Sequence, residues 1–161
     1  MRTLTPVEAA LAFALGGSVL AVFVPAFVKN VHASRMTEPL DGLARIAGRA
    51  SELADTAPQE RAYPDSAPLT PAQVPRGVLT QDPPGTWQHP TWRLLDFGFD
   101  TPHAYSFEVT SKNAADVSTF RAAAHGDLDA DGVLSSFSLS GSVRPGSAPE
   151  TLPLEVVREV E

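Results

Sequence analysis

The chain opens with a long run of apolar side chains. From Val7 to Val28 only Glu8 is charged, and Arg2 and Lys29 flank the run. At about 1.5 Å per residue, a helix of this length spans roughly the 30 Å of hydrocarbon in a bilayer. The pattern therefore predicts a transmembrane helix over 4–28. Two alternatives stay open: a plain signal anchor, and a secretory signal cleaved after Val31-His32-Ala33.

Beyond this run, apolar residues recur every three or four positions, which is typical of an amphipathic helix. We expect the helix to continue over 29–56, with a kink at Pro25. A local restart follows, in which Thr37 caps the new turn and Pro39 lies within it. The apolar stripe should be buried against a sheet. It consists of Val31, Met36, Leu40, Leu43, Ile46 or Ala47, Ala50 and Leu53.

The remainder divides into a Pro-rich part and a β-rich part. Residues 57–90 are polar and rich in proline, which cannot donate to a ladder, so they predict an ordered loop that Trp87 holds to the domain. Residues 91–161 predict an antiparallel β domain, because apolar and polar residues alternate between turn signals. The four expected strands are 91–99, 103–110, 118–125 and 133–143, and Leu154, Val156 and Val160 suggest an added edge strand. The predicted fold class is α+β, with a long N-terminal helix packed on a four-stranded antiparallel meander.

Composition excludes several classes of protein. The 161 residues carry a net charge of −7. The part after Lys29 has a more negative net charge, because the first 29 residues contain two basic residues, Arg2 and Lys29, and only one acidic residue, Glu8. Nucleic-acid binding requires the opposite sign. There is no cysteine, so disulfides, thiolate zinc sites and thiol nucleophiles are excluded. The four histidines are scattered, and no HExxH, Gly-x-Ser-x-Gly or P-loop motif is present, so we do not expect an enzyme.

One loop has the composition of a cation site. Asp127, Asp129 and Asp131 alternate and are followed by Gly132. Calcium takes six to eight oxygens, and this spacing curls three carboxylates around one ion. Val133 could add a carbonyl and Ser135 a water-mediated contact, although Ser138 stands where a calcium loop has a bidentate Glu. The alternative is an ordinary Asp/Gly-rich hairpin turn. His125, next to this loop, could serve as a ligand or a base, but a lone histidine at a strand end is more often solvated, and that is the expectation.

The N-terminal run resembles the signature of type IV pilins and type II secretion pseudopilins. Leu4-Thr5-Pro6-Val7-Glu8 matches the start of the mature chain, Gly17 matches the glycine of the helix, and Pro25-Ala26-Phe27 matches the Pro-x-aromatic element, without a gap. The resemblance implies a leader of residues 1–3, processed between Thr3 and Leu4 by a prepilin peptidase. Thr3 replaces the glycine that the family usually has there.

The C-terminal half is also similar to myxobacterial pilin-like proteins. The elements concerned are Trp92, Leu95 and Phe97, then Tyr105-Ser106-Phe107, then Gly126-Asp127-Leu128-Asp129. Some pseudopilins bind calcium in their β-region, which agrees with a calcium site at Asp127 to Ser135. The implied fold is the pilin architecture, a long helix packed on an antiparallel sheet.

The resemblance implies a structural subunit, favoured as a minor one, of a type IV pilus or a type II secretion pseudopilus. Its partners would be other pilin or pseudopilin subunits, bound through the N-terminal helix. After cleavage, Glu8 would neutralise the terminal amine of a neighbouring subunit, which is then on Leu4. If the leader is not cleaved, Glu8 would pair with Arg2 or with the Met1 amine of a neighbour. Alternatively, the Glu8 carboxylate reaches the lipid headgroups. The chain would cross the inner membrane once, with its C-terminal domain periplasmic or extracellular. The rival is a membrane-anchored, calcium-binding periplasmic domain that never assembles.

Overall fold

The computed structural model describes residues 36–157. The chain divides into two units, Met1–Arg35 and Met36–Glu161, and the first lies outside the described residues together with 158–161. The predicted transmembrane helix, the kink at Pro25, the processing residues Thr3 and Leu4, and the assembly residues Glu8 and Gly17 therefore stay predictions. Within residues 36–157, no helix has both the length and the apolar character that crossing a bilayer requires.

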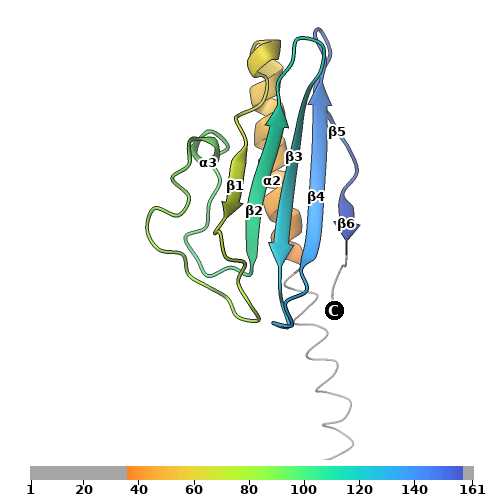
Figure 1. Ribbon diagram of the computed structural model, residues 1–161. Helices are drawn as coiled ribbons and strands as arrows, with labels where there is room; N and C mark the ends of the chain where they lie inside the picture. Colours follow the sequence, from red (N-terminus) through yellow and green to blue (C-terminus); the bar gives the residue numbers. More distant parts are fainter. Residues whose placement is uncertain (1–35, 158–161) are drawn as a thin grey trace, which may run out of the picture. The chain divides into compact units, whose positions relative to one another are not determined.

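The described part is an α+β fold with one antiparallel sheet (Figure 1). Its strands follow the order β1-β2-β3-β4-β5, and β6 also pairs with β4. The helices are α2 (Thr37–Thr56), the short 3-10 helix η1 (Gln59–Arg61) and α3 (Pro90–Leu94). The strands are β1 (Ala67–Thr70), β2 (Tyr105–Lys112), β3 (Ser118–Gly126), β4 (Ser135–Val143), β5 (Glu150–Thr151) and β6 (Glu155–Val157). The α+β class is as predicted, but the sheet has six strands rather than four.

The predicted strand at 91–99 is wrong, because this segment begins with α3. Pro90 occupies the first turn, and the His89 ring accepts a hydrogen bond from the Thr91 amide at 3.3 Å. Proline is tolerated at the start of a helix because the amide of a residue there has no intrahelical acceptor, so its absence loses no hydrogen bond. Trp92 and Leu95, three residues apart, are both buried. A separation of three residues is typical of a helix, but the apolar residues of this short segment are equally compatible with a strand.

Three further strands, β1, β5 and β6, come from segments that were predicted as loop or as uncertain. β5 was not predicted, and it pairs with Gly141 and Ser142 of β4. β1 lies inside the Pro-rich segment 57–90 and pairs with β2 at the end of the sheet. An edge position tolerates Pro68, since one side of an edge strand needs no ladder donors. The predicted edge strand in the tail is present as β6, which pairs with Ser136 to Ser138 of β4. Val160 lies outside the described residues.

The start of α2 differs from the prediction in its cap. Met36 is the N-cap residue and makes no side-chain capping bond, so Thr37 is the first helical residue rather than the cap. Pro39 lies in the first turn as expected. Glu38 accepts hydrogen bonds from the Ala104 amide at 2.9 Å and the Tyr105 amide at 3.0 Å. This carboxylate thereby connects the start of α2 to the start of β2.

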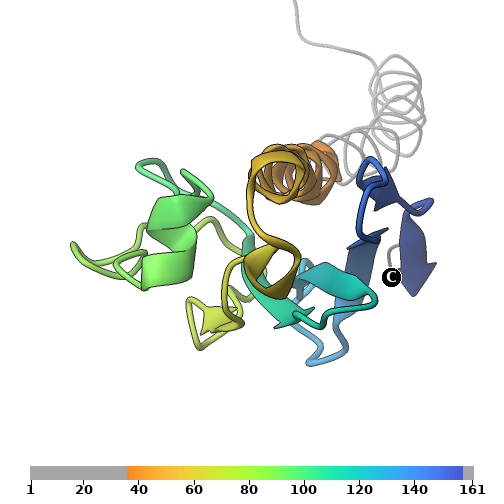
Figure 2. The ribbon, with the colours of Figure 1, turned by 90° about the horizontal axis from the view of Figure 1, so that it is seen from above.

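The sheet has an inner face that two different structures cover (Figure 2). α2 packs on β3 and β4, and we call this part the helical half. Residues 71–104, with α3, pack on β1 and β2 and form the aromatic half. Trp87 lies 5.5 Å from the ring centres of both Trp92 and Phe97. The prediction that Trp87 holds the Pro-rich segment to the domain is thus confirmed.

The predicted stripe of α2 is largely confirmed. Leu43, Ile46, Ala47 and Ala50 are buried and Met36 and Leu53 are half-buried, but Leu40 is 39% exposed. Val31 lies outside the described residues. The alternation in the strands is also as predicted. The buried inner side chains are Tyr105, Phe107 and Val109 of β2, Phe120, Ala122 and Ala124 of β3, and Phe137 and Val143 of β4.

Candidate metal centre

The hairpin between β3 and β4 brings the three predicted carboxylates together. β3 ends at Gly126, which is paired with Ser135 at the start of β4. Ligand oxygens of Asp127, Asp129 and Asp131 all lie within 4.8 Å of one another. Gly132 has a φ of +90°, a left-handed conformation that suits glycine and lets the loop close tightly.

Local hydrogen bonds hold the two exposed acids. The Asp131 amide donates to Asp129 Oδ1 at 3.2 Å, and the Val133 amide donates to Asp131 Oδ1 at 2.6 Å. Such bonds from a carboxylate to the backbone two residues on are the usual Asx turns of a hairpin loop. They leave the second oxygen of each carboxylate for another partner.

Asp127 differs from the other two because it is buried. Its side chain is 0% exposed, and Asp127 Oδ2 accepts a hydrogen bond from Arg76 Nε at 3.1 Å. Asp127 Oδ1 is buried and has no hydrogen-bond partner among the residues that the structure describes. An ionised oxygen without a donor is costly to bury, and ordered water or an ion commonly accounts for such a group.

Arg76 is the member of this site that sequence reasoning missed. It comes from the segment after β1, 51 residues before Asp127 in the chain. A parallel bridge joins Arg76 to Asp127, and the Gly77 amide donates to the Asp127 carbonyl at 2.7 Å. One guanidinium against three carboxylates leaves two negative charges, which matches a divalent cation. No local motif signals this contact, because it depends on how the Pro-rich segment folds back.

The two remaining predicted ligands lie at the neck of the hairpin. The Ser135 hydroxyl donates to the Gly126 carbonyl at 3.2 Å, and Ser135 is buried. Val133 contributes its amide to Asp131. Ser138, at the position where calcium loops carry a bidentate Glu, lies in β4 and accepts from Arg121 instead. The chain thus offers three carboxylates for a cation, and a full calcium shell would need further oxygens.

The histidines do not join this cluster. His125 is partly buried rather than solvated, with Nδ1 at 2.8 Å from the Ser136 hydroxyl and Nε2 at 3.6 Å from Glu108. His103 is buried in the aromatic half, where its Nε2 lies 2.9 Å from Asp82 Oδ2. Trp87 donates to the same Asp82 oxygen at 2.7 Å. This buried group is engaged by protein partners on each side, so it is structural.

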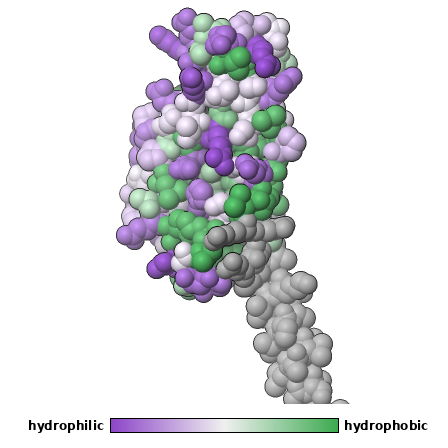
Figure 3. Space-filling model, turned by 45° about the vertical axis from the view of Figure 1, so that its right-hand side comes forward, coloured by the Kyte–Doolittle hydropathy of each residue, from purple (hydrophilic) through white to green (hydrophobic). Residues whose placement is uncertain are grey.

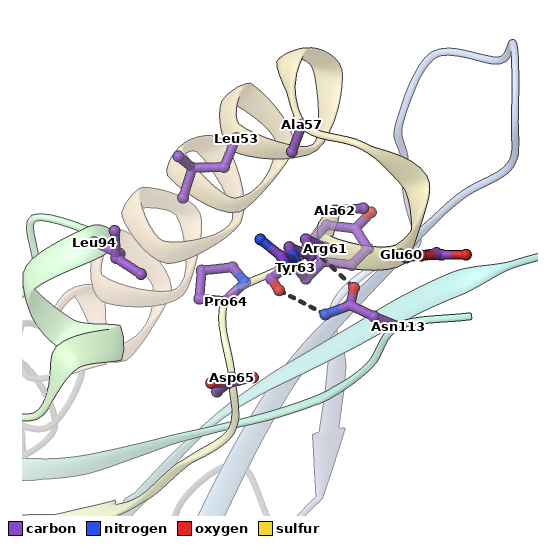
Figure 4. A pocket seen from close by; sticks show the side chains of 10 residues that line it. All are labelled: Leu53, Ala57, Glu60, Arg61, Ala62, Tyr63, Pro64, Asp65, Leu94 and Asn113. Carbon is purple, nitrogen blue, oxygen red and sulfur yellow. Dashed lines mark hydrogen bonds between the residues drawn. The ribbon is translucent and has the colours of Figure 1, made fainter. Parts of the chain in front are cut away.

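A second concave feature lies at the other end of α2 (Figure 4). The end of α2, η1 and Leu94 surround a cavity of about 400 Å³. Tyr63 and Asn113 form its floor: the Asn113 side chain accepts from the Tyr63 amide at 3.0 Å and donates to the Tyr63 carbonyl at 2.7 Å. Burial raises the pKa of the Tyr63 phenol above its usual value of 10.0. Its lining mixes apolar residues with Glu60, Arg61 and Asp65 and has no recognisable catalytic arrangement.

Comparison of the chain with protein-family models, with curated proteins and with solved structures found no match.

Proposed function

We propose that this chain is a structural subunit, favoured as a minor one, of a type IV pilus or a type II secretion pseudopilus. It would assemble through the apolar segment 4–28. The observation that carries the proposal is the placement of Glu8 in that segment, with Gly17 and Pro25 at the spacing described above. The fold of residues 36–157 is compatible with it, because α2 packs along an antiparallel sheet.

The charge of Glu8 supplies the physical argument. A carboxylate inside a membrane helix costs up to about 2.5–3.5 kcal/mol on insertion scales, the full cost applying at the centre, so such residues are normally functional. A neighbour's terminal amine would neutralise it, and a charge pair in hydrocarbon is far more favourable than two separate charges. Before assembly, the chain would cross the inner membrane once and carry the C-terminal domain outside. A prepilin peptidase would cut before Leu4.

Disulfide cross-linking in membranes tests this proposal. The natural chain has no cysteine, so Val7→Cys provides a single reporter. We expect a disulfide-linked dimer on oxidation, which is the largest product that one thiol per chain can form, and a lower yield of this dimer when Glu8→Gln is added. Glu60→Gln, which changes an exposed acid outside the segment, is the matched control and should leave the yield of the dimer unchanged. A protein that stays monomeric, or is indifferent to Glu8→Gln, would contradict the proposal. Mass spectrometry of the mature N-terminus would show whether residues 1–3 are removed.

A second candidate function has its own observation. The buried Asp127 Oδ1 without a described partner favours a divalent cation, with calcium as the first candidate, held by Asp127, Asp129 and Asp131. This ion would stabilise the hairpin by neutralising three mutually repelling carboxylates. If the chain does not assemble, it would act as a membrane-anchored calcium-binding domain. Cation binding is equally compatible with a filament subunit.

Thermal unfolding of the full-length protein in detergent tests the cation site. Calcium at 100 times its dissociation constant should add about 2.7 kcal/mol of stability, and a chelator should remove it. Asp129→Asn should abolish most of the calcium response. Asp116→Asn changes an exposed acid in the other hairpin turn, between β2 and β3, and should keep the full response. An equal response of all three proteins would contradict the site.

A further inference from the structure

Two loops pack against each other at one end of the sheet. Residues 76–81 follow β1 in the chain, and residues 127–134 form the hairpin between β3 and β4. The Gly77 amide donates to the Asp127 carbonyl at 2.7 Å, and a Cβ on Gly77 would lie only 3.2 Å from the Ala130 Cβ. We call these two loops together the loop end.

The loop end lies at the same end of the sheet as the start of α2. Glu38, in the first turn of α2, accepts a hydrogen bond from the Tyr105 amide at 3.0 Å, and Tyr105 is paired with Gly126, the residue before the hairpin. Figure 1 shows the hairpin and the start of α2 at the same end of the sheet. The chain therefore enters α2 beside the loop end.

The loop end gathers exposed apolar side chains. Val78 is 66% exposed, Leu79 is 52% exposed and Leu134 is 39% exposed. These are three of the eight large apolar side chains that are exposed within residues 36–157. Figure 3 shows hydrophobic and hydrophilic side chains together at the lower end of the described part. Exposed apolar residues bordered by polar ones are typical of a surface that contacts another protein or a membrane.

The charge of the loop end depends on whether a cation is bound. Arg76 and the three aspartates of the hairpin are the ionisable residues of the two loops. The exposed Asp100 borders them, because its carbonyl accepts a hydrogen bond from Gln81 at 3.0 Å. One arginine against four aspartates leaves a charge of −3, and a divalent cation reduces this to −1. Bound cation therefore lowers the repulsion between the loop end and a negatively charged surface.

We propose that the loop end docks on the headgroups of an anionic phospholipid bilayer through a divalent cation held by the three aspartates. The inference rests on the membrane segment and the cation site of the proposed function. Calcium takes six to eight oxygens, so three carboxylates leave its shell incomplete. Asp129 and Asp131 are exposed, and on their side the phosphate oxygens of lipids can complete the shell. Val78, Leu79 and Leu134 would enter the boundary between headgroups and acyl chains.

The length of chain before α2 favours a bilayer as the partner of this surface. Segment 7–28 is the predicted membrane helix, and Met36 follows Val28 by eight residues. An extended chain spans at most about 3.6 Å per residue, so Met36 lies within about 30 Å of Val28. The nine residues of β4 place the opposite end of the sheet about 30 Å beyond the loop end. The predicted membrane helix thus keeps the loop end, rather than the opposite end, near lipid.

Quenching of a fluorescent label by lipids tests the docking with the full-length protein in vesicles. The natural chain has no cysteine, so Leu79→Cys provides a single position for an environment-sensitive label. The vesicles contain phosphatidylglycerol, phosphatidylethanolamine and a phospholipid with a nitroxide quencher near its headgroup. We expect quenching in calcium to be at least about two-fold stronger than in a chelator, because the label moves from water into the headgroup boundary.

Leu94→Cys is the matched control for the label. Leu94 is 54% exposed, close to the 52% of Leu79, but it lines the cavity at the other end of α2. Calcium should therefore leave its quenching unchanged. In the Leu79→Cys chain, adding Asp129→Asn should remove the calcium-dependent quenching. Adding Asp116→Asn, in the turn between β2 and β3, should retain it. Melting temperatures equal to that of the natural protein verify that both labelled variants are folded.

The outcomes separate this inference from the proposed function. A label on Val19→Cys reports whether segment 7–28 is in the bilayer, and calcium-dependent quenching confined to Leu79 supports the docking. Quenching at Val19, with quenching at Leu79 no stronger in calcium than in chelator, overturns the docking and leaves the filament subunit standing. A calcium-dependent blue shift at Leu79 without lipid quenching also overturns it, because protein then covers the loop end. Absence of quenching at Val19 overturns the membrane segment and the docking together.

Discussion

The two halves of the inner face are covered by different kinds of side chain. In the helical half, small residues on both sides let α2 come close to β3 and β4: Ala47, Ala50 and Ala54 of α2 and Ala122 and Ala124 of β3 are all buried. In the aromatic half, large rings fill the space over β1 and β2, with Phe97 and Phe107 only 5.0 Å apart. A regular helix can rely on small residues because its backbone supplies the bulk.

The halves also differ in how they treat buried polar groups. The helical half buries almost only hydrocarbon along α2. The aromatic half encloses Asp82, His103 and the Trp87 ring nitrogen in one hydrogen-bonded group, and the Trp92 ring nitrogen donates to Thr70 at 2.9 Å. An irregular segment leaves ring nitrogens and backbone groups to be satisfied individually, whereas a helix satisfies its own backbone. The aromatic half should therefore be more sensitive to single substitutions.

The largest effect is expected at the centre of the aromatic half. Trp92 is 0% exposed, and Trp92→Ala should lower the free energy of unfolding by about 3–5 kcal/mol because it leaves a cavity. Leu94→Ala, on the same short helix but 54% exposed, should change it by less than about 0.5 kcal/mol. Urea denaturation of both variants measures the difference. Equal effects would show that α3 is not anchored through Trp92.

Removing the buried carboxylate should have the next largest effect. Asp82→Ala leaves the Trp87 ring nitrogen and His103 without a shared acceptor. A buried group left unpaired costs about 1–3 kcal/mol. Asp100→Ala removes an exposed acid of the same segment and serves as the control, with a change within about 0.5 kcal/mol. A cost at Asp82 no larger than at Asp100 would contradict a structural role for the hydrogen-bonded group.

Two glycines of α2 should respond with opposite signs. Gly42 is where the halves meet, and a Cβ there would lie 2.6 Å from the Phe107 ring. Gly42→Ala should therefore destabilise by about 1–3 kcal/mol through overpacking. A Cβ on Gly48 meets nothing within 4 Å, so Gly48→Ala should stabilise by up to about 1 kcal/mol through helix propensity. Thermal and urea unfolding would reveal the signs, and two changes of the same sign would refute this account of the contact.

The smallest effect is expected at Tyr63, which packs on Phe120 in the helical half at 4.8 Å between ring centres. Burial raises the pKa of Tyr63 above 10.0, so the folded state holds the phenolic proton more tightly than the unfolded state. This contribution is present below about pH 10 and is lost as the pH rises beyond it. Tyr63→Phe should leave stability at pH 7 nearly unchanged and flatten its decline above pH 10. If the stabilities of Tyr63→Phe and of the natural protein fell in parallel above pH 10, a group other than Tyr63 would be responsible for the loss of stability.

Periodicity was sufficient wherever one element buries one face. The three- and four-residue spacing of Leu43, Ile46 and Ala50 predicted α2 because only one side of that helix meets the sheet. The alternation of Phe107 and Val109 likewise predicted β2. Leu40 belongs to the same apolar pattern and yet is exposed, because α2 lies over the central strands and leaves the sheet margin uncovered. The sequence shows that residue 40 is apolar, but it does not show whether another element covers this side chain.

The sequence by itself determined the apolar segment, the amphipathic helix, three of the strands and the cluster of three aspartates, since each depends on neighbours along the chain. Only the tertiary structure decided that 91–99 begins as a helix, that a Pro-rich segment supplies β1, and that Arg76 meets the buried Asp127 across 51 residues. These features arise from contacts between distant segments. Their free energy is gained only when the chain closes on itself, so no local pattern of residues carries them.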